Sequence, residues 1–173
     1  MNHKICEPNL CKYHLFMIFQ KMVGSPVQYD EIIDTLGGFR EKKKKDKVDA
    51  NLWVYLSQKI KGGAAGKAWE YSVCADNDNQ VSINLAGKES LVWTAGIVAH
   101  EMGHNLGMSH DFIDKHGKKE PRLFNGKDCN CQGIESNEGY CGWRPLKWSE
   151  CSRNDFLAHF NSIGENHWCL ESK

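Results

Sequence analysis

The strongest signal in the chain is the stretch His100-Glu101-Met102-Gly103-His104-Asn105-Leu106-Gly107-Met108-Ser109-His110-Asp111. On a helix, residues four apart lie one above the other, so His100 and His104 would direct both imidazoles to one point. Gly107 can leave the helix in a left-handed conformation that other residues adopt at a cost. The chain can then turn sharply and bring His110 to the same point from another direction.

This spacing predicts a catalytic zinc site. Three neutral imidazoles, from His100, His104 and His110, leave the fourth position of a tetrahedral zinc open for water. Glu101 stands next to the first ligand and can reach that water as a general base. A lone histidine on an apolar face is more often a core residue, but three histidines and a glutamate at this spacing are typical of zinc hydrolases. No other cofactor-binding residue is predicted.

The surrounding sequence predicts a mixed α/β domain. Residues 90–106 favour a helix with Ser90 as its N-cap. Its predicted apolar face consists of Leu91, Val92, Ala95, Val98, Ala99 and Met102. Strands are expected at 48–57, 69–74 and 81–85, while 13–22 could be a strand or a short helix.

A final helix is expected at 152–160, where Ser152 and Asp155 form a capping-box-like pair. Its inner face would be formed by Phe156, Leu157 and Phe160. Between the two helices we expect a long irregular loop.

Composition narrows the classes of function. The chain has 173 residues, with 22 Lys and Arg against 22 Asp and Glu, so its formal net charge is zero. This balance argues against a nucleic-acid binder and against a polybasic membrane-surface protein. The apolar run 15–19 is too short to cross a bilayer, and the N-terminus does not resemble a signal peptide. Composition therefore indicates one soluble domain.

Eight cysteines indicate an oxidising compartment. They are Cys6, Cys11, Cys74, Cys129, Cys131, Cys141, Cys151 and Cys169. No pair has the C-x-x-C spacing of a zinc ribbon, and a reduced cytosolic enzyme usually carries far fewer cysteines. We therefore expect disulfides and a secreted, extracellular protein, with signal and pro-segments absent from this chain.

Residues 100–111 resemble the extended zinc signature of metzincin metalloproteases, and Asp111 after the third histidine points to the reprolysin (adamalysin, M12B) branch. Further matches lie in the strand, glycine-alanine loop and cysteine before the zinc helix, and in the C-terminal cysteine pattern. These are 49–52, 63–74, 129–131, Cys141, 148–152 and Cys169. The resemblance covers about residues 45–173, and the chain looks most like the antarease-like metalloproteases of scorpion and other arachnid venoms.

The resemblance implies a zincin-like catalytic domain, with a mixed twisted sheet, a long active-site helix and a small irregular disulfide-rich C-terminal subdomain. It places this domain at 46–173, with an upper part to about 107 and a lower part at 108–173. Residues 1–45 match poorly, as in a truncated N-terminal segment. The implied disulfides are Cys74–Cys169, Cys129–Cys151 and Cys131–Cys141. Cys6 and Cys11 have no counterpart, and a local pair or a pair with another segment stays open.

The chain departs from the family at the methionine of a tight turn beneath the zinc. It reads Cys141-Gly142-Trp143 where the family has Cys-Ile-Met. In the family, this methionine forms an apolar floor beneath the histidines. Trp143 would either supply that floor or displace it. The loop 110–141 is longer than in typical reprolysins and would border the substrate cleft. Asp49 matches a position linked to structural calcium, but no calcium site is claimed because its other ligands are not evident.

The leading hypothesis is a secreted, venom-type zinc endopeptidase that hydrolyses peptide bonds of protein or peptide substrates as a monomer. It has no nucleic-acid partner and no membrane span. The alternative is a zinc-binding toxin or interaction module with little or no proteolytic activity. Retention of Glu101 argues against that alternative, since zinc binding alone needs no base. A structural zinc domain fits less well because the ligand set leaves an open position.

Overall fold

The computed structural model describes residues 15–19 as backbone, together with 52–57, 64–74, 80–86, 90–136, 141 and 146–163. Four strands precede the first described helix: β1 (Leu15–Phe19), β2 (Leu52–Ser57), β3 (Gly66–Ala68) and β4 (Val81–Leu85). Helix α2 (Leu91–Asn105) is followed by β5 (Phe112–Lys115), β6 (Lys118–Pro121), β7 (Leu123–Phe124), β8 (Lys127–Asp128) and helix α4 (Glu150–Ile163). The mixed α/β class is confirmed.

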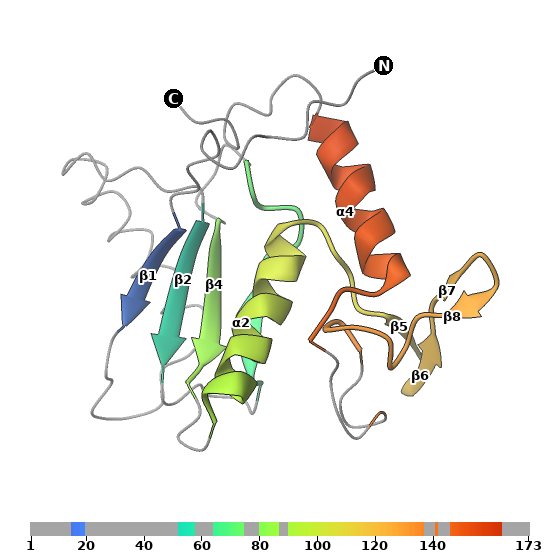
Figure 1. The fold of residues 1–173 in the computed structure, drawn as a ribbon, viewed down its shortest axis with the longest axis horizontal. Helices are drawn as coiled ribbons and strands as arrows, with labels where there is room; N and C mark the ends of the chain where they lie inside the picture. Colours follow the sequence, from blue (N-terminus) through green and yellow to red (C-terminus); the bar gives the residue numbers. More distant parts are fainter. Residues whose placement is uncertain are drawn as a thin grey trace.

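The first four strands form one sheet in the order β1-β2-β4-β3 (Figure 1). Strands β1, β2 and β4 run parallel, and β3 pairs with β4 in the antiparallel direction. All six residues of β2 are buried, as expected for a central parallel strand whose run Leu-Trp-Val-Tyr-Leu is apolar on both faces. The strand alternative for 13–22 is therefore the correct one, and the predictions at 81–85 and within 48–57 are confirmed.

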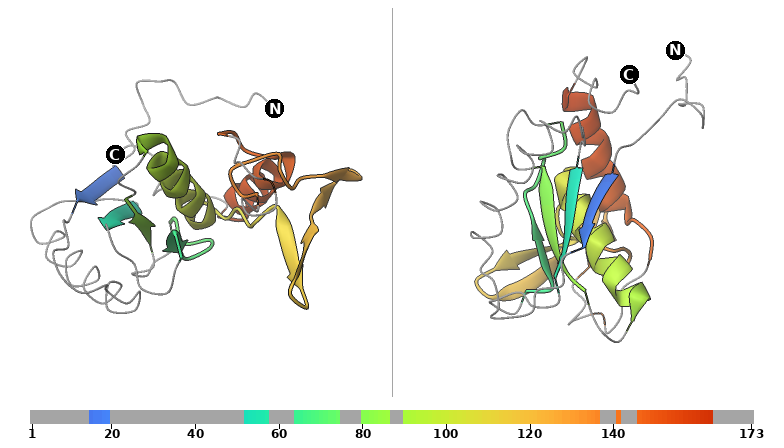
Figure 2. Two further views of the ribbon diagram at one scale, coloured as in Figure 1. Left: turned by 90° about the horizontal axis from the view of Figure 1, so that it is seen from below. Right: turned by 90° about the vertical axis from the view of Figure 1, so that its left-hand side faces the viewer.

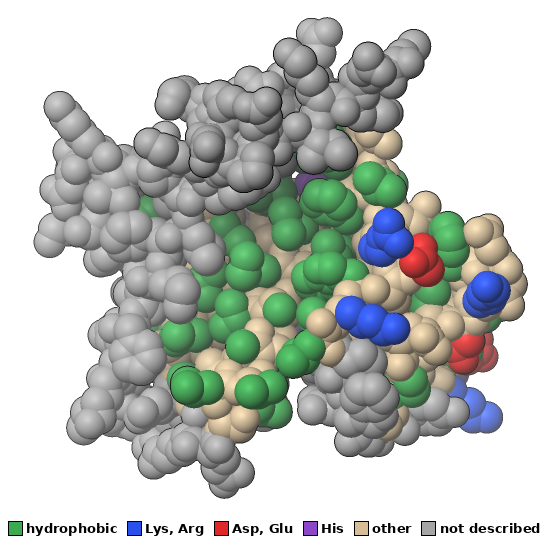
Figure 3. All heavy atoms as spheres, in the orientation of Figure 1, with side chains coloured by type: hydrophobic (Ala, Val, Ile, Leu, Met, Phe, Trp, Pro, Cys, Tyr) green, Lys and Arg blue, Asp and Glu red, His purple; other side chains and the backbone are tan. Residues whose placement is uncertain are grey.

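Helix α2 covers one face of the sheet and lies between the sheet and the C-terminal hairpins (Figures 1 and 2). The core under it is formed by Leu52, Val54, Leu56, Ala86, Val98 and Met102. Ser90 is the N-cap, and its side chain accepts a hydrogen bond from the backbone N–H of Trp93. In the space-filling view, hydrophobic side chains gather over the sheet side, while Lys, Arg, Asp and Glu lie over the C-terminal side (Figure 3).

The predicted apolar face of α2 is wrong in its first turn. Leu91 is 89% exposed, Val92 is 62% exposed, and Ala95 is exposed as well. Helix α2 begins beyond the end of β4 (Figure 1), so its first turn lies past the sheet. Ile97, which was not assigned to the face, is 2% exposed. The buried part of the helix therefore begins at Gly96, and Val98 and Met102 pack on the sheet.

The strand expected at 69–74 is also wrong, because this segment caps α2 instead of joining the sheet. The backbone N–H of Tyr71 donates to the carbonyl of His104 at 3.0 Å, and that of Val73 donates to the carbonyl of Asn105 at 3.0 Å. Tyr71 has a φ of 57°, which no regular strand accommodates. The segment thus satisfies carbonyl groups that the end of a helix leaves without partners.

The long irregular loop predicted between the helices contains two β-hairpins. Strands β5 and β6 are joined at His116 (φ 53°) and Gly117 (φ 77°), and β7 and β8 at Asn125 (φ 49°) and Gly126 (φ 75°). Two consecutive positive φ angles are the mark of a type I′ turn, and Asn-Gly is its strongest sequence signal. The hairpin β5–β6 projects away from the rest of the fold (Figure 2).

Helix α4 starts at Glu150, two residues before the predicted start. Ser149 is the residue before the helix, and its Oγ accepts a hydrogen bond from the backbone N–H of Ser152 at 3.0 Å. The capping pair of Ser152 and Asp155 is therefore wrong. Leu157, which was assigned to the inner face, is 52% exposed.

Candidate metal centre

The end of α2 and the turn after it bring the three predicted histidines together. His100 and His104 lie on the last turns of the helix, and Gly107 leaves it with a φ of +88°. The ring centroids are 4.7 Å apart for His100 and His104, 5.1 Å for His100 and His110, and 4.8 Å for His104 and His110. The left-handed residue after the helix thus returns His110 to the first two imidazoles, as the spacing predicts.

Backbone carbonyls set the orientation of two of the rings. Nδ1 of His104 lies 2.8 Å from the carbonyl oxygen of Met108. Nδ1 of His100 lies 3.1 Å from the carbonyl oxygen of Ile134. Since a carbonyl only accepts, both Nδ1 atoms carry the hydrogen in the neutral rings. Nε2 then keeps the lone pair that a metal ligand needs.

The spacing of these nitrogens fits a tetrahedral metal. Nε2 of His100 and Nε2 of His110 are 3.2 Å apart. Two nitrogens bound to one tetrahedral zinc at about 2.0–2.1 Å lie about 3.3–3.4 Å from each other. Three neutral imidazoles are also a donor set that zinc prefers. Together with Glu135, the three histidines offer ligand atoms that all lie within 4.8 Å of one another.

Glu101 is brought to the same end of the fold by α2 and lies against the edge strand β3. Its side chain is 5% exposed. A Cβ added to Gly66 would lie 2.5 Å from Oε1 and 2.7 Å from Cγ of Glu101. The glutamate therefore occupies space that any larger residue at position 66 would fill.

The segment after the third histidine holds His110 in place. The ring of Phe112 stacks on that of His110, with centroids 4.7 Å apart and planes 7° from parallel. Arg122 donates from its guanidinium to the carbonyl oxygens of Ser109 and His110 at 3.4 and 3.2 Å. The same guanidinium forms a two-point ion pair with Asp155 at 2.7 and 2.8 Å. His110 is thus linked to α4 through Arg122.

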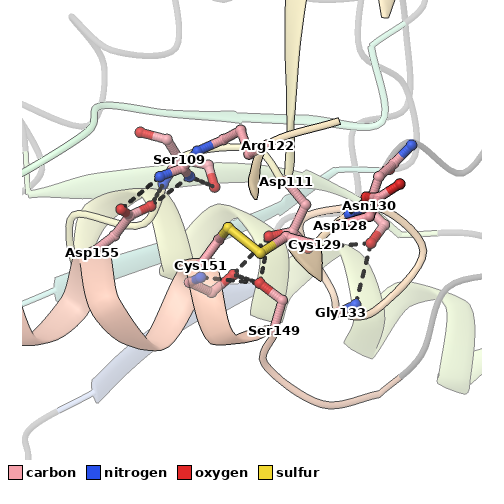
Figure 4. The surroundings of a disulfide bond; sticks show 12 residues. Ser109, Asp111, Arg122, Asp128, Cys129, Asn130, Gly133, Ser149, Cys151 and Asp155 are labelled. Carbon is pink, nitrogen blue, oxygen red and sulfur yellow. Dashed lines mark hydrogen bonds and ion pairs between the residues drawn. A yellow bond between two sulfur atoms is a disulfide. The ribbon is translucent and has the colours of Figure 1, made fainter. Parts of the chain in front are cut away.

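Asp111 anchors the chain directly after His110, and its carboxylate points towards Ser149 (Figure 4). Its carboxylate is 0% exposed and accepts hydrogen bonds from three hydroxyl groups, those of Ser136, Ser149 and Ser152. Burial raises the pKa of Asp111, while these hydroxyls and the charge of Arg122 act in the opposite direction. Asp111 therefore ties the turn after His110 to the start of α4.

Two disulfides fasten the C-terminal part, as the resemblance implied. Cys129 is bonded to Cys151 and Cys131 to Cys141 (Figure 4 shows the first). Cys74 is also disulfide-bonded. Cys6, Cys11, Cys169 and Trp143 lie outside the described residues, so the pairing of the first three and the floor expected from Trp143 stay predictions.

Sequence reasoning missed Glu135 and Phe112. Phe112 directly follows the signature and comes two residues after His110 in the sequence. This separation could have indicated a contact between the two rings. Glu135 comes 25 residues after His110 in a cysteine-rich segment, and no spacing rule connects it with the histidines. Its place follows from the two hairpins and the disulfides, which return the chain to α2.

Comparison with known proteins gives a consistent result. A family model described as "Reprolysin (M12B) family zinc metalloprotease" matches residues 23–173. The human "Disintegrin and metalloproteinase domain-containing protein 9" is 35% identical over 129 residues, which are 71% of this chain and 14% of that protein. "Zinc metalloproteinase-disintegrin-like brevilysin H2a" from Gloydius brevicauda is 34% identical over 134 residues, which are 71% of this chain and 27% of that protein.

The chain thus spans about a quarter or less of the length of these relatives. Among solved structures, "Structure of a chaperone-substrate complex" is matched over 84% of this chain and 26% of that chain, at 15% identity and a TM-score of 0.45. A likeness at this level does not define the fold.

Proposed function

Because the chain belongs to the reprolysin (M12B) family of zinc metalloproteases, we propose that it is a zinc-dependent endopeptidase that hydrolyses peptide bonds of protein substrates. The observation that carries the proposal is the convergence of three imidazoles, with Nε2 of His100 and His110 at 3.2 Å, and a buried Glu101 that directly follows His100 on the same helix. The metal ligands are His100, His104 and His110, and the catalytic residue is Glu101.

The chemistry divides between the metal and the chain. Zinc bound to three imidazoles supplies Lewis acidity, which acidifies water and polarises a carbonyl group. Glu101 takes the proton from the attacking water and passes it to the leaving amine, as a general base and then a general acid. The carbonyls of Met108 and Ile134 keep Nδ1 of His104 and His100 protonated and so hold Nε2 towards the metal.

The finer assignment is a secreted, monomeric protease of the venom type. Its catalytic domain is 46–173, joined by β1, which pairs with β2 in the same sheet. The disulfides Cys129–Cys151 and Cys131–Cys141 support an oxidising, extracellular location. The likeness to brevilysin H2a and the sequence resemblance to antarease-like arachnid enzymes support a venom role. No helix in the described part of the chain is long and apolar enough to cross a membrane.

The test is casein cleavage by the wild type and by Glu101→Gln, each with and without a chelator. Wild-type cleavage should disappear with chelator and return with zinc. Glu101→Gln should retain about one zinc per chain while losing about 10²–10⁴-fold in rate, the usual contribution of general acid–base catalysis. If Glu101→Gln keeps more than a tenth of the wild-type rate, Glu101 is not the general base. A wild type that binds zinc and cleaves nothing would favour the interaction module instead.

A further inference from the structure

Glu135 is a buried acidic residue in the histidine cluster to which the proposed reaction gives no role. Its side chain is 0% exposed. Oε2 lies 3.0 Å from Nδ1 of His100 and 3.7 Å from Nε2 of His104. A carboxylate therefore lies against two of the three proposed ligands.

The backbone around Glu135 is held from two sides. Its carbonyl oxygen accepts a hydrogen bond from the backbone N–H of Asp111 at 2.9 Å. The backbone N–H of Ile134 donates to the carbonyl of Lys147 at 2.9 Å. The segment is therefore paired both with the turn after His110 and with the chain before α4, and these contacts set the position of the carboxylate.

Helix α2 leaves space for this carboxylate at Gly103. A Cβ added to Gly103 would collide with Oε1 of Glu135, and it would lie 3.0 and 3.1 Å from two ring carbons of Trp148. Position 103 is one helical turn from His100, so both face the same side of α2. The glycine in this turn of the helix makes the contact between Glu135 and His100 possible.

The edge of the His100 ring that Glu135 faces distinguishes a direct metal ligand from a residue that orients the ring. Nε2 of His100 faces Nε2 of His110 at 3.2 Å. Nδ1, at the other edge of the ring, faces both Oε2 of Glu135 at 3.0 Å and the carbonyl of Ile134 at 3.1 Å. The carboxylate thus approaches His100 from behind its metal-facing nitrogen, and at 3.7 Å it lies beyond hydrogen-bond distance from Nε2 of His104. The Nδ1–H donates to the carbonyl of Ile134, and the carboxylate acts on the same edge of the ring through its charge. Groups of this kind behind a metal-bound histidine fix the ring and raise its basicity.

Charge supports the same role. A buried carboxylate is costly unless it is paired with positive charge and hydrogen-bond donors. A divalent cation on the Nε2 side would make the Nδ1–H of His100 a stronger donor, and the carboxylate would in turn increase electron density at Nε2. Each therefore stabilises the other across one imidazole.

We propose that Glu135 is a positioning residue that orients His100 and strengthens metal binding without being a ligand or a base. This inference rests on the metal-binding part of the proposed function. It does not depend on proteolysis.

The test is the zinc dissociation constant, measured by competition with a chromophoric chelator. Glu135→Gln keeps the shape of the side chain and removes its charge, and it should weaken zinc binding about 10–100-fold, as other losses of this kind do. The matched control is Glu120→Gln, the same change on β6 in a side chain that is 50% exposed and pairs with Lys115. The control should stay within twofold of the wild type. An unchanged affinity in Glu135→Gln would overturn the proposal.

Cobalt substitution separates positioning from direct ligation. If Glu135 acts behind His100, wild type and Glu135→Gln should give the same visible Co²⁺ bands, and azide should shift both spectra. A change in the bands on removing the carboxylate would show that Glu135 is itself a ligand, which overturns the positioning role.

Gly103→Ala offers a second variant if Glu135→Gln folds poorly, as judged by circular dichroism. The added methyl group should displace the carboxylate and weaken zinc binding, while Gly96→Ala on the same helix should not, because its nearest neighbour would be 3.9 Å away. Normal affinity in Gly103→Ala would contradict the inference. A wild type that binds zinc tightly but cleaves no protein would defeat the protease proposal alone.

Discussion

Two glycines on different elements give room to the two carboxylates near the histidines. Gly66 on β3 lies against Glu101, and Gly103 on α2 lies against Glu135. Neither glycine has a positive φ among those recorded for the chain, so their value is the missing side chain rather than backbone freedom. A methyl group at either position would displace the side chain of the neighbouring glutamate without removing its carboxylate.

Gly66→Ala should lower proteolytic activity and leave zinc binding intact. The new Cβ would lie 2.5–2.8 Å from Oε1, Cγ and Cδ of Glu101, so the flexible side chain must shift from its place against β3. Because general acid–base catalysis contributes about 10²–10⁴-fold, we expect kcat to fall about tenfold or more. Steady-state kinetics with a quenched peptide and a zinc titration would measure the two effects.

Gly96→Ala is the matched control for this change. Its Cβ would have only Leu146 nearby, at 3.9 Å, and alanine is favoured over glycine inside a helix by about 1 kcal/mol. This variant should keep wild-type kcat and be at least as stable. Equal kcat in both alanine variants would show that Glu101 need not occupy its observed place.

The residues of the signature could be predicted because local geometry decides them. Positions 100 and 104 share a helical face, and Gly107 must leave the helix in a left-handed conformation, which its φ of +88° confirms. Glu135 could not be predicted, since its contact with His100 depends on 34 intervening residues. Asp155 was likewise expected to cap α4 and instead pairs with Arg122, 33 residues away.

Among the elements, the contact between α4 and the end of α2 depends on His159. Its side chain lies against Gly107, where an added Cβ would be 2.7 Å away, and its ring meets that of Tyr71 at 5.2 Å in an edge arrangement. Burial lowers the pKa of His159, and a hydrogen bond with the backbone of Val73 offsets this in part. The docked helix therefore favours the neutral imidazole.

This pKa shift predicts a pH dependence of stability. In the unfolded chain His159 titrates near the ordinary value of about 6.5, so below that pH the unfolded state binds more protons than the native state. The contribution of neutral His159 to stability is fully present above about pH 6.5 and is lost as the pH falls towards the lowered pKa. His159→Phe should therefore lose less Tm than the wild type between pH 7.5 and pH 5.

The control for this experiment is His116→Asn. His116 is exposed in the hairpin turn with a φ of 53°, which asparagine tolerates. This variant should follow the wild-type pH profile. Comparing variants cancels the contribution of the three clustered histidines, which all proteins in the series share. Identical slopes for His159→Phe and the wild type would refute the role of His159.

Elements with strong local signals were predicted well, and those set by distant partners were not. Strand β4 and the N-cap of α2 follow from pattern and capping chemistry. The segment 69–74 looks like a strand because Trp69, Tyr71 and Val73 alternate with other residues, but the carbonyls of His104 and Asn105 determine its path. The hairpin β7–β8 carried an Asn-Gly turn signal that could have been read from the sequence.

For the whole molecule, the disulfides should contribute to the metal site as well as to stability. Cys129–Cys151 joins the end of the hairpins to α4, and the following residues 134 and 135 contact His100. The double variant Cys129→Ser/Cys151→Ser should lose about 2–5 kcal/mol of unfolding free energy. It should also bind zinc more weakly, since the segment that orients His100 is less constrained. Urea unfolding and chelator competition would measure the two losses.

Mass mapping of an unreduced digest provides the complementary measurement. It should find Cys129 with Cys151 and Cys131 with Cys141, and we expect Cys74 to be found with Cys169. Recovery of Cys74 with Cys6 or Cys11 would contradict the implied third pair. Normal zinc affinity in the double serine variant would show that the Cys129–Cys151 disulfide does not contribute to metal binding.

The arrangement of the sheet has a consequence for the order of events during folding. Strands β1 and β2 pair in parallel across a long separation, with Leu15 opposite Leu52, whereas β5–β6 and β7–β8 are hairpins with two-residue turns. Hairpins close in about 1–10 μs, and non-local parallel pairing is slower. His100 and His104 lie on the helix that packs on the sheet, whereas His110 leads directly into the first hairpin. We therefore expect the three proposed ligands to reach their final positions at different times during folding. His100 and His104 on α2 should be placed last. Metal binding should therefore coincide with completion of the sheet and not with formation of the earlier hairpins.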